Sequence, residues 1–300
     1  MEATRIRALL PWITAVALLG GCGSAAGGSP AGDDLDGLRQ QARAALDRYD
    51  QAVRDTGDTA RFVPVGELTR QLGDWELANG AYKESLAAGR VEATAALPTA
   101  PTPTGNLVWA DGTKQPLPLV AADETLAQLR QAGTGDCVDC APIKVTGARL
   151  TTMAISTTRG SATVPAWEYT LDGTAVRLTR PAVAASSAVQ VAPPPWDPDK
   201  PTGGLQIETA TTATTSRELA VTFTGAPDPR TKPCGADYSA EAVESDQAVV
   251  VIVIEHRHAS AESCGDVGAR RSATVELARP LGERAVLEVQ QGLPVSVTIR

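Results

Sequence analysis

Aromatic residues and histidine are scarce in this chain. Only 4% of its 300 residues are aromatic, and it has two histidines and two phenylalanines. Hydrophobic residues still make up 43%, a share typical of folded proteins rather than of disordered chains. We therefore expect alanine, valine, leucine and threonine to fill the cores.

Signatures of catalysis are also lacking. A Ser–His or Cys–His mechanism would have to use His256 or His258, the two histidines of the chain. The sequence after residue 21 has no Gly-x-Ser-x-Gly elbow, phosphate-binding loop or dinucleotide fingerprint. We assign no catalytic residue and no cofactor. Paired carboxylates stay open, because the sequence does not show which acids face each other.

A basic patch is missing as well. The formal net charge is -8, and the arginines are scattered along the chain. Such a chain has no electrostatic footprint for nucleic acid or for an anionic lipid surface. We therefore expect no nucleic-acid partner.

The N-terminus carries a short apolar segment. Arg5 and Arg7 precede residues 8–19, which are almost wholly apolar. As a helix this segment would reach only ~18 Å, against ~30 Å for the hydrocarbon core of a bilayer. A basic head followed by a short apolar run and small residues is typical of a secretory signal.

The end of this segment reads Leu19-Gly20-Gly21-Cys22. This sequence resembles the lipobox of bacterial lipoproteins, whose cysteine is lipidated and becomes the mature N-terminus. The resemblance implies palmitate on Cys22, membrane lipid as a partner, and a location on the extracytoplasmic face of the cell membrane. The alternative is an ordinary signal peptide that is cut nearby.

Four further cysteines remain after Cys22, namely Cys137, Cys140, Cys234 and Cys264. An even number in an exported protein predicts two disulfides, with three connectivities open. We predict Cys137–Cys140 and Cys234–Cys264, because the first two lie together in the first half of the chain. The second bridge would close a loop of about 30 residues, worth roughly 3–4 kcal/mol in the chain-entropy model.

Two other interpretations of these residues compete with structural disulfides. A redox Cys-x-x-Cys site of the thioredoxin type needs its first cysteine at a helix N-terminus, whereas Cys140 is followed by a β-type run. A zinc site would need a second pair with the same spacing. His256 and His258 would share one face of a strand and are weak candidates for metal binding, but no third ligand is identifiable.

Periodicity predicts one amphipathic helix and many short strands. The helix begins at Leu35 and ends before Gly57, and its apolar stripe needs a partner, which we expect to be the sheet that follows. Trp167 is expected to anchor a core, and Pro165 indicates an edge or a bulge. The other expected elements are a helix at 123–132 and strands at 61–66, 75–78, 91–97, 107–110, 116–120, 143–157, 162–171, 174–179, 219–224, 248–255, 272–277, 285–289 and 295–299.

The predicted fold class is mainly β with a minor α component. We expect an N-terminal amphipathic helix and a small α+β unit, followed by an antiparallel β-sandwich-like domain. The expected division is a lipoprotein signal peptide at 1–21, the lipidated cysteine and a flexible tether at 22–33, an α+β and β-rich domain at 34–185, a proline-rich linker at 186–204, and an antiparallel β domain at 205–300.

Three phrases add a family resemblance: Cys137-Val138-Asp139-Cys140, Val164-Pro165-Ala166-Trp167, and residues 280–287. With the lipobox, they resemble uncharacterised surface lipoproteins of high-GC Gram-positive, actinobacterial-type bacteria. The resemblance implies an exported, β-rich envelope protein and brings no activity. We expect a non-enzymatic binding or structural module whose partner is another envelope protein or a cell-wall polymer. The alternatives are a carboxylate-dependent cell-wall hydrolase and an extracytoplasmic thiol–disulfide protein.

Overall fold

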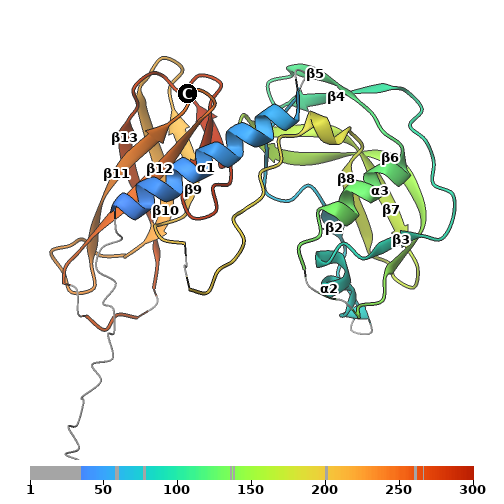
Figure 1. The fold of residues 1–300 in the computed structure, drawn as a ribbon, viewed down its shortest axis with the longest axis horizontal. Helices are drawn as coiled ribbons and strands as arrows, with labels where there is room; N and C mark the ends of the chain where they lie inside the picture. The colour runs from blue at the N-terminus through green and yellow to red at the C-terminus, as the bar shows by residue number, and fades with distance from the viewer. Residues whose placement is uncertain are drawn as a thin grey trace, which may run out of the picture.

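The computed structural model describes residues 35–57, 61–76, 79–135, 137, 139–199, 202–259, 262–265 and 267–300. The expected signal peptide, Cys22 and the tether lie outside these residues. The predicted fold class is confirmed: strands dominate the described part, and three α-helices accompany them. Figure 1 shows the strands in two groups, with the helix α1 (Leu35–Asp55) lying over one group and reaching toward the other.

The first group is an eight-stranded sheet. Its centre is the long antiparallel hairpin of β6 and β7, whose inward side chains alternate with exposed ones. Helices α2 (Tyr82–Ala87) and α3 (Ala122–Gln131) accompany this sheet. Its strands are β1 (Pro64–Val65), β2 (Arg70–Leu72), β3 (Val91–Ala93), β4 (Thr104–Trp109), β5 (Lys114–Pro118), β6 (Ile143–Thr157), β7 (Gly160–Leu171) and β8 (Arg177–Pro181).

Trp167 anchors the core of this sheet, as predicted. Its side chain is 2% exposed, and its indole N–H donates to the carbonyl oxygen of Val120 at 2.9 Å. The edge or bulge expected at Pro165 is wrong, because β7 lies inside the sheet. Pro165 falls where β7 changes partner from β4 to β8, so that the missing N–H disrupts neither ladder.

The second group forms a sandwich of two sheets. One sheet has the order β13-β10-β9-β15 and the other β11-β12-β14, and two of the pairings, β12 with β14 and β15 with β9, are parallel. The strands are β9 (Ile207–Thr212), β10 (Glu218–Gly225), β11 (Ala236–Glu244), β12 (Ala248–Arg257), β13 (Ala269–Glu276), β14 (Ala285–Glu288) and β15 (Ser296–Ile299).

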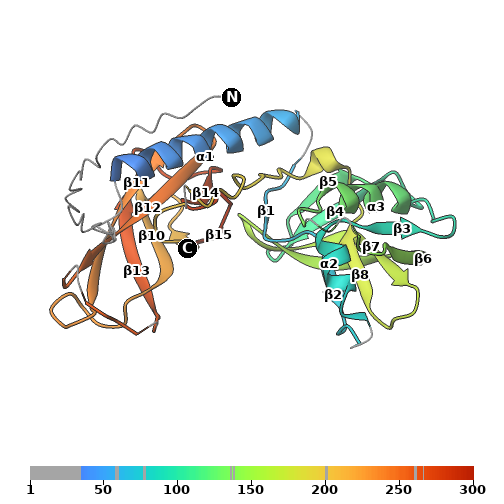
Figure 2. The same ribbon diagram turned by 60° about the horizontal axis from the view of Figure 1, so that its bottom comes forward.

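Strand β12 is buried on both faces over its first six residues. Val249, Val251 and Val253 face the interior of the sandwich, whereas Val250 and Ile252 face α1. Figure 2 shows α1 lying lengthwise over the strands β11 and β12. The partner that we expected for this helix is therefore wrong: α1 covers the C-terminal sheet rather than the sheet that follows it in sequence.

The helix itself is confirmed, with the predicted apolar stripe facing inward. Polar contacts fix its position: Gln41 Nε2 donates to the carbonyl oxygen of Val289 at 2.7 Å, and Arg39 pairs with Glu241 at 2.7 Å. Among the described residues, no helix combines the length and the apolar character needed to cross a membrane. The buried residues of α1 are Leu38, Ala42, Ala45, Leu46, Tyr49 and Val53.

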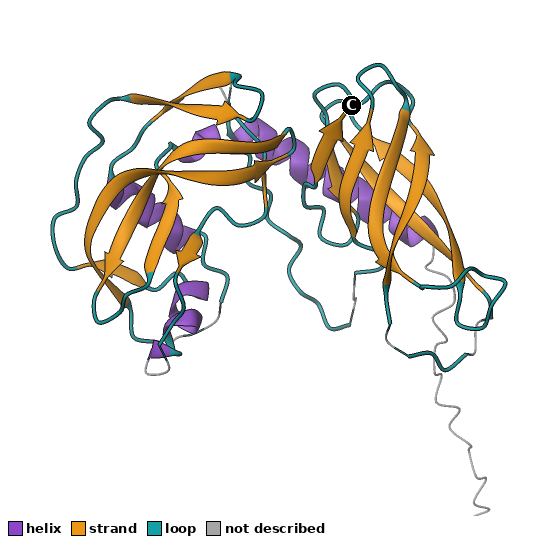
Figure 3. Ribbon diagram, turned by 180° about the vertical axis from the view of Figure 1, so that it is seen from behind, coloured by secondary structure: helices purple, strands orange, loops and turns teal. Residues whose placement is uncertain are grey.

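The segment between the two groups of strands starts as packed structure. Phe62 and the residues around Ala188 exchange backbone hydrogen bonds, with Phe62 N donating to Ser187 O and Val189 N donating to Phe62 O, both at 3.0 Å. The expected linker at 186–204 is thus fixed at its first residues, and Figure 3 shows loops and α1 joining the two groups of strands. Trp75 and Glu76, at the start of an expected strand, lie in a loop.

Candidate functional site

The structure joins the cysteines in the two predicted pairs. Cys137 and Cys140 form a disulfide with their Cα atoms 5.5 Å apart, in the loop between α3 and β6. Cys234 and Cys264 form the other, with a Cα–Cα distance of 5.6 Å across 30 residues of sequence. Both distances are ordinary for disulfides, and the predicted disulfide bonds are confirmed.

The loop that carries Cys137 and Cys140 is held on α2 from both sides. Before the cysteines, the amides of Thr134 and Gly135 both donate to the carbonyl oxygen of Ala87, at 3.0 and 2.9 Å. After them, the hydroxyl of the buried Ser85 donates to the carbonyl oxygen of Ala141 at 2.9 Å. The disulfide therefore has a defined position relative to the helix.

Two glycines make this close approach to α2 feasible. A Cβ atom on Gly133 would lie 2.4 Å from the amide nitrogen of Gly89, and one on Gly135 would lie 2.9 Å from the carbonyl carbon of Ala87. Backbone meets backbone here, so a side chain at either glycine would push the loop away. The Gly133-Thr134-Gly135 sequence is thus a requirement of the site.

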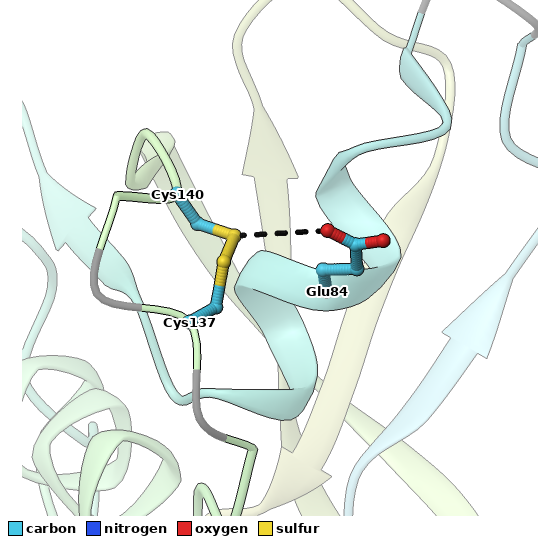
Figure 4. A group of neighbouring side chains, drawn as sticks. All are labelled: Glu84, Cys137 and Cys140. Carbon is cyan, nitrogen blue, oxygen red and sulfur yellow. Dashed lines mark hydrogen bonds between the residues drawn. A yellow bond between two sulfur atoms is a disulfide. The ribbon is translucent and has the colours of Figure 1, made fainter.

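Charges of opposite sign flank the two ends of the disulfide. In Figure 4, the carboxylate of Glu84 points from α2 toward Cys140, with Oε2 4.0 Å from Sγ of Cys140. At the other end, Nη1 of Arg90 donates to the carbonyl oxygen of Cys137 at 3.4 Å. The backbone of Arg90 is fixed in turn, because its amide donates to Ser85 O and its carbonyl accepts from Ile143 N, both at 2.8 Å.

This arrangement suits sulfur chemistry better than metal binding. Glu84 and the two sulfur atoms lie within 4.8 Å of one another, but the sulfurs are bonded to each other and offer no thiolate to a metal. Cys137 does not begin a helix, so the thioredoxin-type source of thiolate stabilisation is absent from the described residues around it. The charged residues described beside the disulfide are Glu84, Arg90 and Asp139, and Asp139 lies between the two cysteines in the sequence.

A carboxylate also accompanies the second disulfide, but it is fully engaged. Glu262 accepts the amide of Cys234 at 2.7 Å and lies 2.7 Å from Nδ1 of His258. The hydrogen bond from the amide of Cys234 is the main cause that holds the pKa of Glu262 below its usual value; burial opposes it, and the nearby His258 adds to the lowering. Glu262 therefore serves to fix the Cys234 turn.

The structure does not bring the two histidines together as ligands. His256 Nε2 lies 2.8 Å from the hydroxyl of Ser239, while His258 faces Glu262. Within the described part of the chain, no cluster of three metal-ligating side chains includes a histidine.

A hollow of about 440 Å³ lies where the C-terminal half of α1 meets residues 185–192. Its walls combine alanines with a few polar groups, and Asp55 is the one carboxylate among its lining residues. A carboxylate-dependent hydrolase needs two acids that face each other, which this hollow does not offer. The lining residues are Arg48, Gln51, Ala52, Asp55, Thr56, Ala185, Ser186, Ala188, Gln190 and Ala192.

No protein-family model matches the chain, and no curated protein or solved structure matches it either. Sequence reasoning identified Cys137 and Cys140 but missed Glu84, Ser85 and Arg90. These three residues lie about 50 positions upstream, on or just after a short helix that has no clear periodic pattern. The glycines before Cys137 were the available signal of a close backbone approach.

Proposed function

We propose that this chain is an exported lipoprotein, anchored to the outer face of the cell membrane through lipid on Cys22. The observation that carries the proposal is the distribution of the five cysteines. Four of them pair as disulfides, which suits an oxidising exterior. The fifth stands in Leu19-Gly20-Gly21-Cys22, where a lipid is attached in the proteins whose lipobox this sequence resembles.

Metabolic labelling with an alkyne fatty acid tests the anchor. We expect the label on the wild-type chain, in the membrane fraction, and a mature N-terminus at a diacylated Cys22 by mass spectrometry. A Cys22→Ala chain should take up no label. Cys264→Ala is the matched control, because it removes a cysteine outside the lipobox and should still be labelled. An unmodified N-terminus at another residue would refute the proposal.

We further propose that the anchored protein is a binding module for another envelope protein. The hollow beside α1 supports this role, because its apolar walls and its polar groups Arg48, Gln51 and Gln190 combine the two kinds of contact found in protein interfaces. A cell-wall polymer is the other partner that the test can reveal.

Site-specific photo-crosslinking in intact cells tests this role. A photoreactive residue in place of Gln190, in the hollow, should give a discrete adduct of higher mass. The same residue in place of Gln247, which is exposed on the loop between β11 and β12, should not. Equal adducts from both positions, or none from Gln190, would count against the hollow as the binding surface.

A further inference from the structure

We propose that Cys137 and Cys140 form a thiol–disulfide exchange centre that acts on cysteine pairs of other proteins. In this centre Cys137 makes the mixed disulfide with the partner, and Cys140 resolves it with Glu84 as the proton acceptor. The proposal does not depend on the lipid anchor, because it concerns the chemistry of the described part of the chain.

The position of Glu84 is the first argument. Its carboxylate is exposed, and its Oε2 atom lies 4.0 Å from Sγ of Cys140. Once the disulfide opens, rotation of the Cys140 side chain from 4.0 Å to hydrogen-bond distance lets this carboxylate take the proton of the thiol. The held loop keeps this geometry, because hydrogen bonds to Ala87 and from Ser85 fix it on both sides of the cysteines.

The unequal surroundings of the two sulfurs are the second argument. The negative charge of Glu84 opposes a thiolate on Cys140, whereas on the Cys137 side Nη1 of Arg90 donates to the carbonyl oxygen of Cys137. The attacking thiolate is therefore Cys137. Cys140 stays a thiol until its proton moves to Glu84, which suits the residue that resolves the mixed disulfide.

The second disulfide lacks these features. The carboxylate beside it, Glu262, is already bound to the amide of Cys234 and to His258. It also closes a long loop, because 30 residues separate Cys234 from Cys264. This pair is a structural bridge and gives an internal control in the same molecule.

The exchange balances in atoms and electrons when the co-reactant is a protein dithiol. A thiolate of the partner attacks Sγ of Cys137, the bond between the two sulfurs breaks, and Cys140 leaves with the electron pair and takes up a proton. The second thiolate of the partner then attacks its own sulfur in the mixed disulfide and releases Cys137 as a thiolate. The partner is oxidised to a disulfide by two electrons, which reduce the Cys137–Cys140 pair. In the reverse direction Glu84 accepts the proton of Cys140.

Equilibration with glutathione, followed by differential alkylation and peptide mapping, tests whether the pair exchanges at all. We expect Cys137 and Cys140 of the full, folded chain to reach equilibrium with millimolar glutathione within minutes, while Cys234 and Cys264 stay oxidised. The mapping separates all five cysteines, so Cys22 does not disturb the measurement whether it carries lipid or not. A Cys137–Cys140 pair that exchanges no faster than Cys234–Cys264 would overturn the proposal.

Stopped-flow kinetics of the mixed disulfide with glutathione test the assigned roles. Glu84→Gln should slow its resolution on the order of 10²-fold at neutral pH and make the rate rise tenfold per pH unit toward the thiol pKa of ~8.5, whereas the wild-type rate should be nearly flat. Glu92→Gln, the same charge change at an exposed position of β3, should match the wild type. Cys140→Ser should accumulate the mixed disulfide on Cys137. A wild-type pH profile in Glu84→Gln, or trapping on Cys140 instead, would overturn the assignment.

Discussion

Arg284 lies buried just before β14, and its hydrogen bonds run inside the C-terminal sandwich. Its guanidinium pairs with Glu244 at the end of β11 and donates to the carbonyl oxygens of Arg279, Pro280 and Leu281. Burial alone would raise the pKa of Glu244, but the hydrogen bonds from Arg284 and from the amide of Ala278 outweigh it and hold the pKa below its usual value. One side chain thus ties a strand to the loop that leads into β14.

Replacing Arg284 by methionine should cost about 3 kcal/mol of unfolding free energy. The change leaves Glu244 partly buried without its cation and three carbonyl groups without a donor. Arg279→Met is the matched control: its pair with Asp246 is exposed, so the expected cost is below ~0.5 kcal/mol. Urea unfolding measures both, and equal costs would show that the buried pair has no special role.

Glu76, at the surface of the first sheet, makes a contribution to stability that depends on pH. Hydrogen bonds from the hydroxyl of Thr174 at 2.6 Å and the amide of Ala175 at 3.0 Å lower the pKa of this exposed carboxyl to about 2. Because the folded pKa lies below the unfolded value of ~4.3, the contribution to stability is complete above pH ~4.3 and is lost as the pH falls toward 2. NMR titration should show this midpoint. Thr174→Val should raise it, whereas Thr113→Val, remote from Glu76, should not.

At the scale of elements, local pattern predicted what the chain forms but not what each element contacts. The predicted bounds of β6 are those observed, and the predicted stripe of α1 is the buried one. Strands β2, β9 and β11 and helix α2 escaped prediction. β2 and α2 are short, and β11 alternates polar residues mostly with alanine, which is a weak signal for a strand. The apolar stripe of α1 requires a cover, yet nothing in it specifies a strand about 200 residues away.

The packing of α1 on β12 predicts a regional effect of core mutations. Leu46→Ala in α1 should destabilise the C-terminal sandwich by about 2–4 kcal/mol, because Leu46 packs with Val250 and Ile252. Leu126→Ala in α3 is the matched change in the other core, where Leu126 packs with Tyr169 and Leu178. Amide hydrogen exchange should show lost protection in β12 for the first variant and in β7 and β8 for the second. The opposite assignment would contradict this packing.

At the scale of the whole molecule, the sequence order and the spatial order differ. From Leu35 the chain lies on the C-terminal sandwich as α1, passes into the first sheet near Phe62, and returns through the segment that begins at Val189. The sandwich is therefore built from two pieces of sequence that are separated by the whole first sheet. Any division of the chain at residue 204 alone leaves β12 with one face uncovered.

This discontinuity predicts which part of the chain folds alone. A chain of residues 202–300 should lack stable structure or aggregate, because Val250 and Ile252 would face water. Adding residues 35–57 ahead of it should restore a soluble monomer. A linker must join residue 57, at the end of the helical piece, to residue 202. Nε2 of Gln41 lies 3.3 Å from the carbonyl oxygen of Gly203, so the linker must run back along the ~24 Å of helix that follows Gln41. A flexible linker of ~20 residues spans this distance. In a control chain with Leu38→Asp and Leu46→Asp in α1, the rescue should fail. Equal hydrogen-exchange protection of β12 in residues 202–300 alone would show that α1 is not part of the sandwich.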